Sequence, residues 1–212
     1  MIEVLAENLA TVLSNSDASF ALLGVFLLIC FSLYVRRIKL TVRMLVYMSL
    51  MLALAILLQQ FRIWQFPQGG SVTFGAMIPL LLLAYRYGVA VGALAGFVFG
   101  MINILLDPFI LHPIQVLFDY PLPFMSLGLA GLFSSRKMLS TALAFACRFA
   151  CHFISGVVFF ASYAPPETSA ALYSFTANLT YMLPECLICF SILKFLPLER
   201  LLQSMDTTAE LR

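Results

Sequence analysis

The sequence predicts an all-α integral membrane protein, because it is unusually apolar and its apolar residues are grouped in long runs. Hydrophobic residues make up 62% of the 212 residues and charged residues 10%, whereas soluble domains carry about 25% charged residues. The mean hydropathy is +1.00. A run of about 20 apolar residues is long enough to cross a bilayer as a helix. The net charge of +2 is too small to indicate nucleic-acid binding.

Seven apolar runs predict seven membrane-spanning segments. They cover residues 19–35, 43–61, 74–87, 88–106, 113–133, 138–162 and 170–196. The third and fourth runs are short and meet at Gly88, so we expect a tight helical hairpin or two tilted half-spans. The opening segment carries three acids and no base, so it lacks the basic region of a cleaved signal peptide. We therefore expect the first run to remain as a membrane helix.

The basic residues predict the orientation of the chain. They gather at alternate turns: Arg36, Arg37, Lys39 and Arg43, then Arg86, then Arg136 and Lys137, and last Lys194 and Arg200. Because basic turns face the cytoplasm, we expect the N-terminus outside and the C-terminus in the cytoplasm. The outer segments QFRIWQFPQGGSVTF, LLDPFILHPIQ and SYAPPETSAAL then hold many of the prolines and glycines. Irregular backbone at this depth is tolerated where it is buried or lines a cavity.

A polar stripe runs along the sixth apolar segment. Arg148, His152, Gly156 and Phe160 recur every four residues, so they share one helix face. At about 1.5 Å per residue, Arg148 lies roughly 16 Å and His152 roughly 22 Å beyond Lys137. Across a hydrocarbon core of about 30 Å, Arg148 is near the midplane and His152 is in the outer half.

Other segments place polar side chains at similar depth. Asp119 and Tyr120 lie near the outer end of the fifth segment, Tyr173 and Asn178 lie in the outer half of the seventh, and Glu185 is near the midplane. Polar groups that converge in an aromatic-lined cavity are typical of small-molecule sites.

Each of these residues also has a structural interpretation. We expect Arg148 to form a buried ion pair with Asp119 or Glu185 that fixes helix packing. His152 could be satisfied by its neighbours alone. Tyr173 and Trp64, the only tryptophan, could be anchors at the membrane interface.

The five cysteines all lie within apolar runs, so a disulfide framework is not expected. Cys186 and Cys189 form a C-x-x-C that would suit an intramembrane thiol oxidoreductase, but they fall in the inner half of the seventh segment. Cys147 and Cys151 are interpreted as small packing residues. Cys151 and His152 point in different directions on a helix, which disfavours a zinc site.

Small residues mark two close helix contacts. Ser49 and Ala53 form a small-xxx-small face on the second segment, which allows another helix to approach. Gly92, Gly96 and Gly100 lie on one face of the fourth segment, where ordinary packing within the chain is the simpler interpretation.

An ordered set of motifs resembles a known family. The motifs are FPQGGSVTFGAMIPLLLLAYRYG, GFVFGMINILLDPFILHPIQVLFDYPLPFMSLGLAGLF and RFACHFISGVVFFASYAP followed by LYSFTANLTYMLPE. Together they resemble the thiamine-specific substrate-binding S component of energy-coupling factor (ECF) transporters, over about residues 43–196. The resemblance implies a six-helix core that captures thiamine from outside. It also implies two kinds of partner, a transmembrane coupling protein and two cytoplasmic ATPases.

The resemblance also implies functional residues. The ligand-binding positions would be Asp119, Tyr120, His152, Gly156, Phe160, Tyr173 and Asn178, with Trp64 on a lid that precedes QGGS. Ser49 and Ala53 would form the docking face for the coupling protein. Two positions depart from the family pattern: Phe160 replaces a tryptophan, and Asp119 replaces a glutamate that is one methylene longer.

These inferences predict three regions. Residues 1–40 would be an extension with one additional N-terminal transmembrane helix, residues 41–197 the six-helix core, and residues 198–212 a short cytoplasmic tail. The expected function is thiamine uptake by a subunit without catalytic activity or cofactor. The sequence contains no P-loop, so ATP hydrolysis would belong to its partners. Two alternatives stay open, an intramembrane enzyme using Asp119, His152 or the C-x-x-C, and a proton-coupled carrier with Asp119, Glu185 and His152 as its relay.

Overall fold

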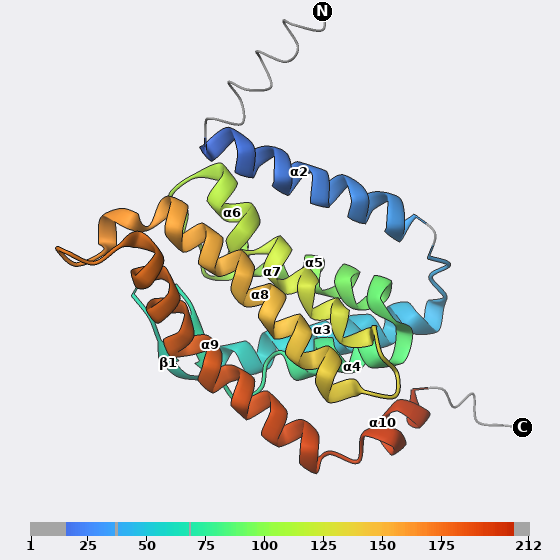
Figure 1. The fold of residues 1–212 in the computed structure, drawn as a ribbon. Helices are drawn as coiled ribbons and strands as arrows, with labels where there is room; N and C mark the ends of the chain where they lie inside the picture. The colour runs from blue at the N-terminus through green and yellow to red at the C-terminus, as the bar shows by residue number, and fades with distance from the viewer. Residues whose placement is uncertain (1–15, 37, 68, 206–212) are drawn as a thin grey trace, which may run out of the picture.

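A computed structural model of the protein describes residues 16–36, 38–67 and 69–205. The described chain is a bundle of helices with one small antiparallel hairpin at one end (Figure 1). The helices are α2 (Ser16–Val35), α3 (Val42–Gln60), α4 (Ile78–Tyr87), α5 (Val89–Leu106), α6 (Pro113–Asp119), α7 (Pro121–Met125), η1 (Ser126–Gly131), α8 (Lys137–Phe159), η2 (Ala161–Tyr163), α9 (Ala170–Phe195) and α10 (Leu198–Ser204). The strands are β1 (Arg62–Gln65) and β2 (Ser71–Thr73). The predicted positions of both chain ends, and Arg37, fall outside the described residues.

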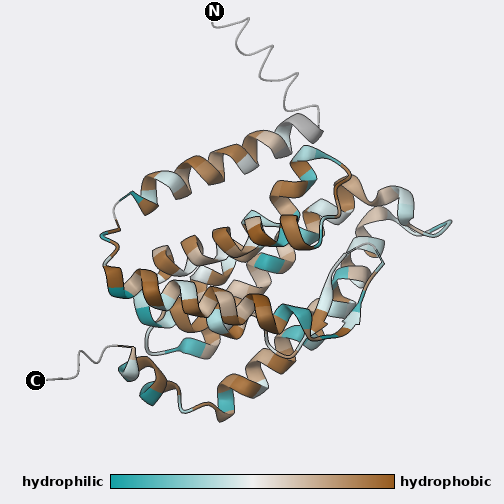
Figure 2. Ribbon diagram, turned by 180° about the vertical axis from the view of Figure 1, so that it is seen from behind, coloured by the Kyte–Doolittle hydropathy of each residue, from teal (hydrophilic) through white to brown (hydrophobic). Residues whose placement is uncertain are grey.

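The helices agree with most of the predicted membrane segments. Among the described residues, α3, α5, α8 and α9 are long and apolar enough to cross a bilayer, and α2 and α4 contribute shorter apolar helices. Figure 2 shows hydrophobic residues along most of the length of these helices. The all-α membrane fold is therefore confirmed. Helix α4 is buried over most of its length and packs against α3, α5 and η1.

The membrane segment predicted over residues 113–133 is not a single helix. This stretch is divided into α6, α7 and η1, and the break between the first two falls at Tyr120 (φ −119°, ψ −78°). The next residue, Pro121, has no N–H to continue the helical hydrogen bonds, and its ring restricts the residue before it. Proline therefore turns the chain at the position where Asp119 and Tyr120 lie.

The outer segment after α3 forms a hairpin that we did not predict. Strand β1 pairs with β2 in antiparallel register, with Trp64 opposite Val72. The connection uses Gly69 and Gly70, both at positive φ (93° and 86°), which glycine adopts without strain. A Cβ at Gly70 would also lie 2.8 Å from the ring of Tyr181, so the turn requires glycine there for two reasons.

A buried carboxylate fastens this hairpin to α9. The Thr73 backbone N–H donates to Glu185 at 2.5 Å, and the Thr73 hydroxyl donates to the same carboxylate at 2.7 Å. Burying a carboxylate is costly unless it is hydrogen-bonded, and these two bonds meet that requirement. Glu185 therefore anchors β2 and is not the hydrogen-bonded partner of Arg148.

The glycine face of α5 allows the broken segment to approach closely. A Cβ at Gly96 would overlap the carbonyl oxygen of Phe124, and a Cβ at Gly100 would lie 2.6 Å from the carbonyl oxygen of Tyr120. Gly92 makes an equally close contact with Ala84 and Gly128. These glycines therefore have the packing role that the sequence predicted. Their close contacts position the junction of α6 and α7.

Helix α2 lies on the outside of the bundle, beside α6 and α5 (Figure 1). Gly24 faces Leu117 of α6, and the ring of Phe31 lies 5.9 Å from that of Phe97 on α5. The additional N-terminal helix is therefore present and packs on the element that carries Asp119.

We expect Gly96→Val to destabilise the bundle, because the new side chain would collide with backbone atoms that cannot move independently of α7. Overpacking costs about 1–3 kcal/mol where side chains can adjust, so we expect a fall in melting temperature of at least about 5 °C in detergent. Met101→Val is the matched control, since it places the same side chain on an exposed position just beyond the glycine face. Equal melting temperatures for the two variants would contradict the packing role.

Candidate ligand-binding site

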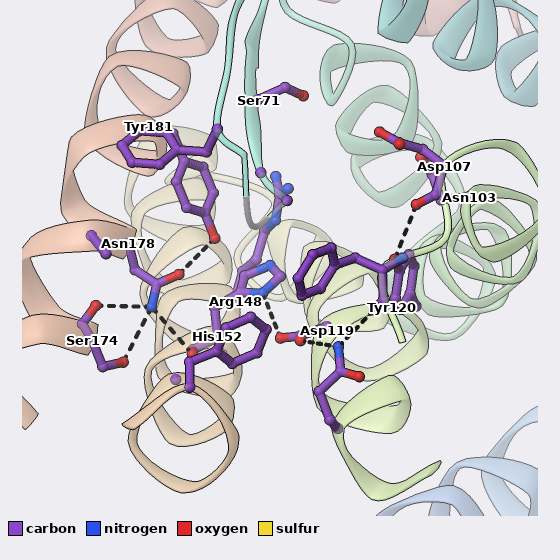
Figure 3. Close-up of a pocket in the computed structure, with 18 of the residues that line it drawn as sticks. Ser71, Asn103, Asp107, Asp119, Tyr120, Arg148, His152, Ser174, Asn178 and Tyr181 are labelled. Atoms are coloured by element: carbon purple, nitrogen blue, oxygen red, sulfur yellow. Dashed lines mark hydrogen bonds and ion pairs between the residues drawn. The ribbon is translucent and has the colours of Figure 1, made fainter. Parts of the chain in front are cut away.

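The hairpin, the end of α5, α6, α8 and α9 enclose a cavity (Figure 3). Its lining residues come from every one of these elements: Gln59, Phe66, Gly69, Gly70, Ser71, Asn103, Asp107, Phe109, Gln115, Asp119, Tyr120, Phe124, Arg148, His152, Gly156, Phe160, Tyr173, Ser174, Ala177, Asn178 and Tyr181. All the ligand-binding residues expected from the sequence lie in this lining except Trp64.

Trp64 lies beside the cavity and not in its wall. It is on β1 with 54% of its surface exposed, and its ring lies 5.1 Å from that of Phe66. Phe66 lines the cavity and also packs against Tyr181, at 6.0 Å between ring centroids. The aromatic that the hairpin presents to the cavity is therefore Phe66, which the sequence interpretation missed.

Asp119 is the centre of a short hydrogen-bonded chain. The Gln115 side-chain amide donates to Asp119 Oδ2 at 2.5 Å, and His152 Nδ1 lies 3.3 Å from Asp119 Oδ1. The predicted convergence of Asp119 and His152 thus occurs, between α6 and α8. Gln115 was not predicted as a site residue, although it lies one helical turn before Asp119.

Asn178 joins α9 to α8. Its side-chain amide donates to the carbonyl of Ser174 at 2.9 Å and to the carbonyl of His152 at 3.2 Å, and its oxygen accepts from the Tyr181 hydroxyl at 2.6 Å. The Ser174 hydroxyl donates across the same contact, to the carbonyl of Phe153 at 2.8 Å. Asn178 therefore holds the helix of His152 in place as well as lining the cavity.

Gly156 has a steric role at this contact. A Cβ there would overlap the Ser174 hydroxyl and come within 3.3 Å of the Asn178 amide nitrogen. The glycine thus lets α8 and α9 approach each other where both helices carry lining residues.

Tyr120 holds the loop between α5 and α6. Its hydroxyl accepts from the Phe109 N–H at 2.7 Å and donates to the carbonyl of Asp107 at 3.0 Å. The ring of Phe109 then stacks on Phe160, with centroids 5.7 Å apart and planes 20° apart. Phe160 therefore stacks on the loop between α5 and α6 at one side of the cavity.

Arg148 does not form the expected ion pair. It is 7% exposed, its guanidinium lies 4.7 Å from the ring centroid of Phe124, and its Nε and one terminal nitrogen have no hydrogen-bond partner among the described residues. The two candidate carboxylates are occupied elsewhere, Asp119 by Gln115 and His152, and Glu185 by Thr73. The prediction failed because the depth of a residue in the membrane does not determine which donor groups form hydrogen bonds with a given carboxylate.

Known proteins resemble this chain over most of its length. A family model described as "Thiamine transporter protein" matches residues 45–204. The chain belongs to this family. The thiamine transporter ThiT of Bacillus subtilis is 38% identical over 157 residues, covering 65% of this chain and 81% of that protein. ThiT of Lacticaseibacillus paracasei is 34% identical over 122 residues, covering 48% and 61%.

A solved structure shares the fold of this member of the thiamine transporter family. The structure of ThiT from Listeria monocytogenes superposes with a TM-score of 0.62 at 23% sequence identity, covering 76% of this chain and 93% of that one. Helix α2 precedes the residues that the family model matches. The relatives are named transporters and not enzymes.

The thiol chemistry left open by the sequence has no support in the site. All five cysteines are free, and neither Cys186 nor Cys189 lines the cavity. Within the described ranges, no group of three or more His, Cys, Asp and Glu side chains is arranged to hold a metal ion.

An ion pair lies beside the cavity. The Arg62 guanidinium of β1 lies 2.6 Å from Asp107 Oδ2 at the end of α5, and the Gln65 side chain donates to the same oxygen at 3.4 Å. Arg62 also donates to the carbonyl of Gln59 at 3.3 Å. These bonds connect the hairpin to the loop that carries Phe109.

We expect Asp107→Asn to loosen the hairpin. Pairs with this degree of exposure stabilise by about 0.2–1 kcal/mol, so amide hydrogen exchange over residues 62–73 should become roughly two- to fivefold faster. The double variant Arg62→Asp with Asp107→Arg should recover part of the protection. Glu199→Gln is the matched control, because it breaks the Lys137–Glu199 pair (2.9 Å) away from the hairpin. Exchange over residues 62–73 that is equally fast in the unaltered protein, in Asp107→Asn and in Glu199→Gln would show that the pair does not hold the hairpin.

Proposed function

We propose that this protein captures thiamine in the cavity between the hairpin and α8, as the substrate-binding S component of an ECF transporter. The observation that carries the proposal is the joint placement of Asp119, His152 and Asn178 around one aromatic-lined cavity, in a chain that belongs to the thiamine transporter family. The named relatives support thiamine as the ligand.

The charge and aromatic character of the cavity suit the thiazolium ring of thiamine. This ring is a cation, and the carboxylate of Asp119, which lines the cavity next to His152, is the acid that would balance its charge. The rings of Phe66, Phe109 and Phe160 line the same space. A cation over an aromatic face gains about 0.5–2 kcal/mol, so the missing tryptophan at position 160 reduces this attraction without removing it.

The polar lining suits the remaining groups of thiamine. The aminopyrimidine ring offers an amine donor and ring-nitrogen acceptors, and the hydroxyethyl arm offers both donor and acceptor. His152, Tyr173 and Asn178 carry the complementary groups. We therefore assign ligand contacts to Asp119, Tyr120, His152, Gly156, Phe160, Tyr173 and Asn178, and we replace Trp64 by Phe66 in this proposal.

We further propose that the hairpin end faces the outside and that partners dock from the membrane and the cytoplasm. Arg43, Arg86, Lys137 and Lys194 lie at the ends of helices that are remote from the hairpin, as the positive-inside rule requires of a cytoplasmic face. Ser49 and Ala53 are exposed on α3 and leave a shallow surface between exposed leucines. This surface would receive the transmembrane coupling protein, which connects to two cytoplasmic ATPases.

A binding titration tests the ligand. Thiamine added to the purified protein in detergent should quench the fluorescence of Trp64, because this side chain packs against Phe66 in the cavity wall. We expect His152→Ala and Asn178→Ala each to raise the Kd at least tenfold, equivalent to about 1.4 kcal/mol. Thr176→Ala is the control on α9, since its hydroxyl donates only to carbonyls of its own helix. A protein that does not respond to micromolar thiamine would refute the proposal.

An uptake measurement tests the partners. Ala53→Trp should leave the Kd for thiamine unchanged, because position 53 does not line the cavity, but it should abolish uptake by preventing close approach of the coupling protein. Leu57→Trp is the control. It places the same bulky side chain one turn further along the exposed side of α3, at a position that is already large and lies outside the small-residue pair. Uptake that persists without the ATPases and collapses with the proton gradient would favour the proton-coupled carrier.

A further inference from the structure

The side chain of Gln115 is buried and fully engaged in hydrogen bonds. It is 1% exposed. Its oxygen accepts from the Leu111 N–H at 3.0 Å, and its nitrogen donates to the carbonyl of Phe109 at 3.1 Å and to Asp119 at 2.5 Å. All three partners are close to it in sequence, and Gln115 itself lines the cavity.

The orientation of this amide is determined by the backbone of the loop. The Phe109 carbonyl can only accept a hydrogen bond and the Leu111 N–H can only donate one. A flipped amide would face each of them with the wrong group. The Gln115 nitrogen therefore points at Asp119, because the hydrogen bonds to the loop backbone decide which side-chain atom is the nitrogen and which is the oxygen.

This donor determines the role of the Asp119 carboxylate. One oxygen accepts from Gln115, and the other lies 3.3 Å from His152 Nδ1. An ionised carboxylate has no proton to donate, so the hydrogen in the second contact belongs to Nδ1 of the imidazole. In neutral His152, Nε2 is then an acceptor. Nε2 has no hydrogen-bond partner among the described residues.

We propose that Gln115 is a positioning residue, which holds Asp119 so that His152 presents Nε2 as an acceptor to the ligand. Figure 3 shows the contact between Asp119 and His152. This inference rests on the proposed capture of thiamine. The ligand group that meets Nε2 must be a hydrogen-bond donor, which in thiamine is either the exocyclic amine of the aminopyrimidine ring or the hydroxyl of the hydroxyethyl arm. We assign the amine to this contact. The chain from Gln115 through Asp119 to His152 thus selects an amine over an oxo group at this position.

The tautomer can be observed directly, because the chain has only two histidines. His112 caps α6 by accepting from the Ile114 N–H at Nδ1, at 3.2 Å. The neutral form of His112 therefore carries its hydrogen on Nε2, whereas that of His152 carries it on Nδ1. Nitrogen-15 NMR of the histidine-labelled protein should show the two opposite tautomers, with His112→Asn used for assignment because asparagine also caps helices.

Selectivity is the second measurement. We compare the Kd for thiamine with that for oxythiamine, in which an oxo group replaces the exocyclic amine. Gln115→Met removes the donor at similar volume, and we expect it to weaken thiamine binding about tenfold and to reduce the thiamine-to-oxythiamine preference at least fivefold. In an Asp119→Asn background the same substitution should change the thiamine-to-oxythiamine preference less than twofold, since Gln115 acts on this preference through that carboxylate.

A loop control separates positioning from loop stability. Arg62→Met removes the ion pair that ties the same loop to the hairpin, lies outside the cavity lining, and leaves the bond between Gln115 and Asp119 intact. We expect it to weaken binding of both ligands equally, with the preference unchanged. An unchanged preference in Gln115→Met, or a His152 that is protonated on Nε2 in the unaltered protein, would overturn the inference. An unaltered protein that binds no thiamine would instead refute the proposed function, and the NMR result would still decide the tautomer.

Discussion

The break between α6 and α7 is the constraint on which the site depends. The break ends α6 at Tyr120, whose hydroxyl reaches back to the loop of residues 107–111 that precedes the helix. Together Tyr120 and Gln115 make four hydrogen bonds to backbone groups of this irregular loop, which no helix or strand would pair. The glycine face of α5 allows the broken segment to pack closely. The residues that make an irregular backbone possible are thus also residues of the cavity wall.

Buried charge is distributed over two separate carboxylates. Glu185 is bonded to the backbone and hydroxyl of Thr73 and belongs to the hairpin anchor. Asp119 is bonded to Gln115 and His152 and faces the cavity. Arg148 lies over Phe124 without a hydrogen bond to either acid. Its charge acts on Glu185 through space and without a hydrogen bond.

Contacts between α8 and α9 serve packing and binding together. Gly156 allows the two helices to approach, and Asn178 bonds to the carbonyl of His152. A substitution at either position therefore affects both the helix contact and the cavity. This explains why the structural and the binding interpretations of the polar stripe on α8 do not exclude each other.

The sequence by itself determined the membrane class, most helix positions, the additional N-terminal helix and the set of polar residues that meet in the cavity. Hydrophobic length and helical periodicity are local properties, and they suffice for this. Only the tertiary structure decided that residues 113–133 are broken, that Phe66 and not Trp64 faces the cavity, and that Glu185 bonds to Thr73 instead of Arg148. The physical reason is that each buried polar group takes the nearest partner with suitable geometry, and that partner is set by how distant segments pack.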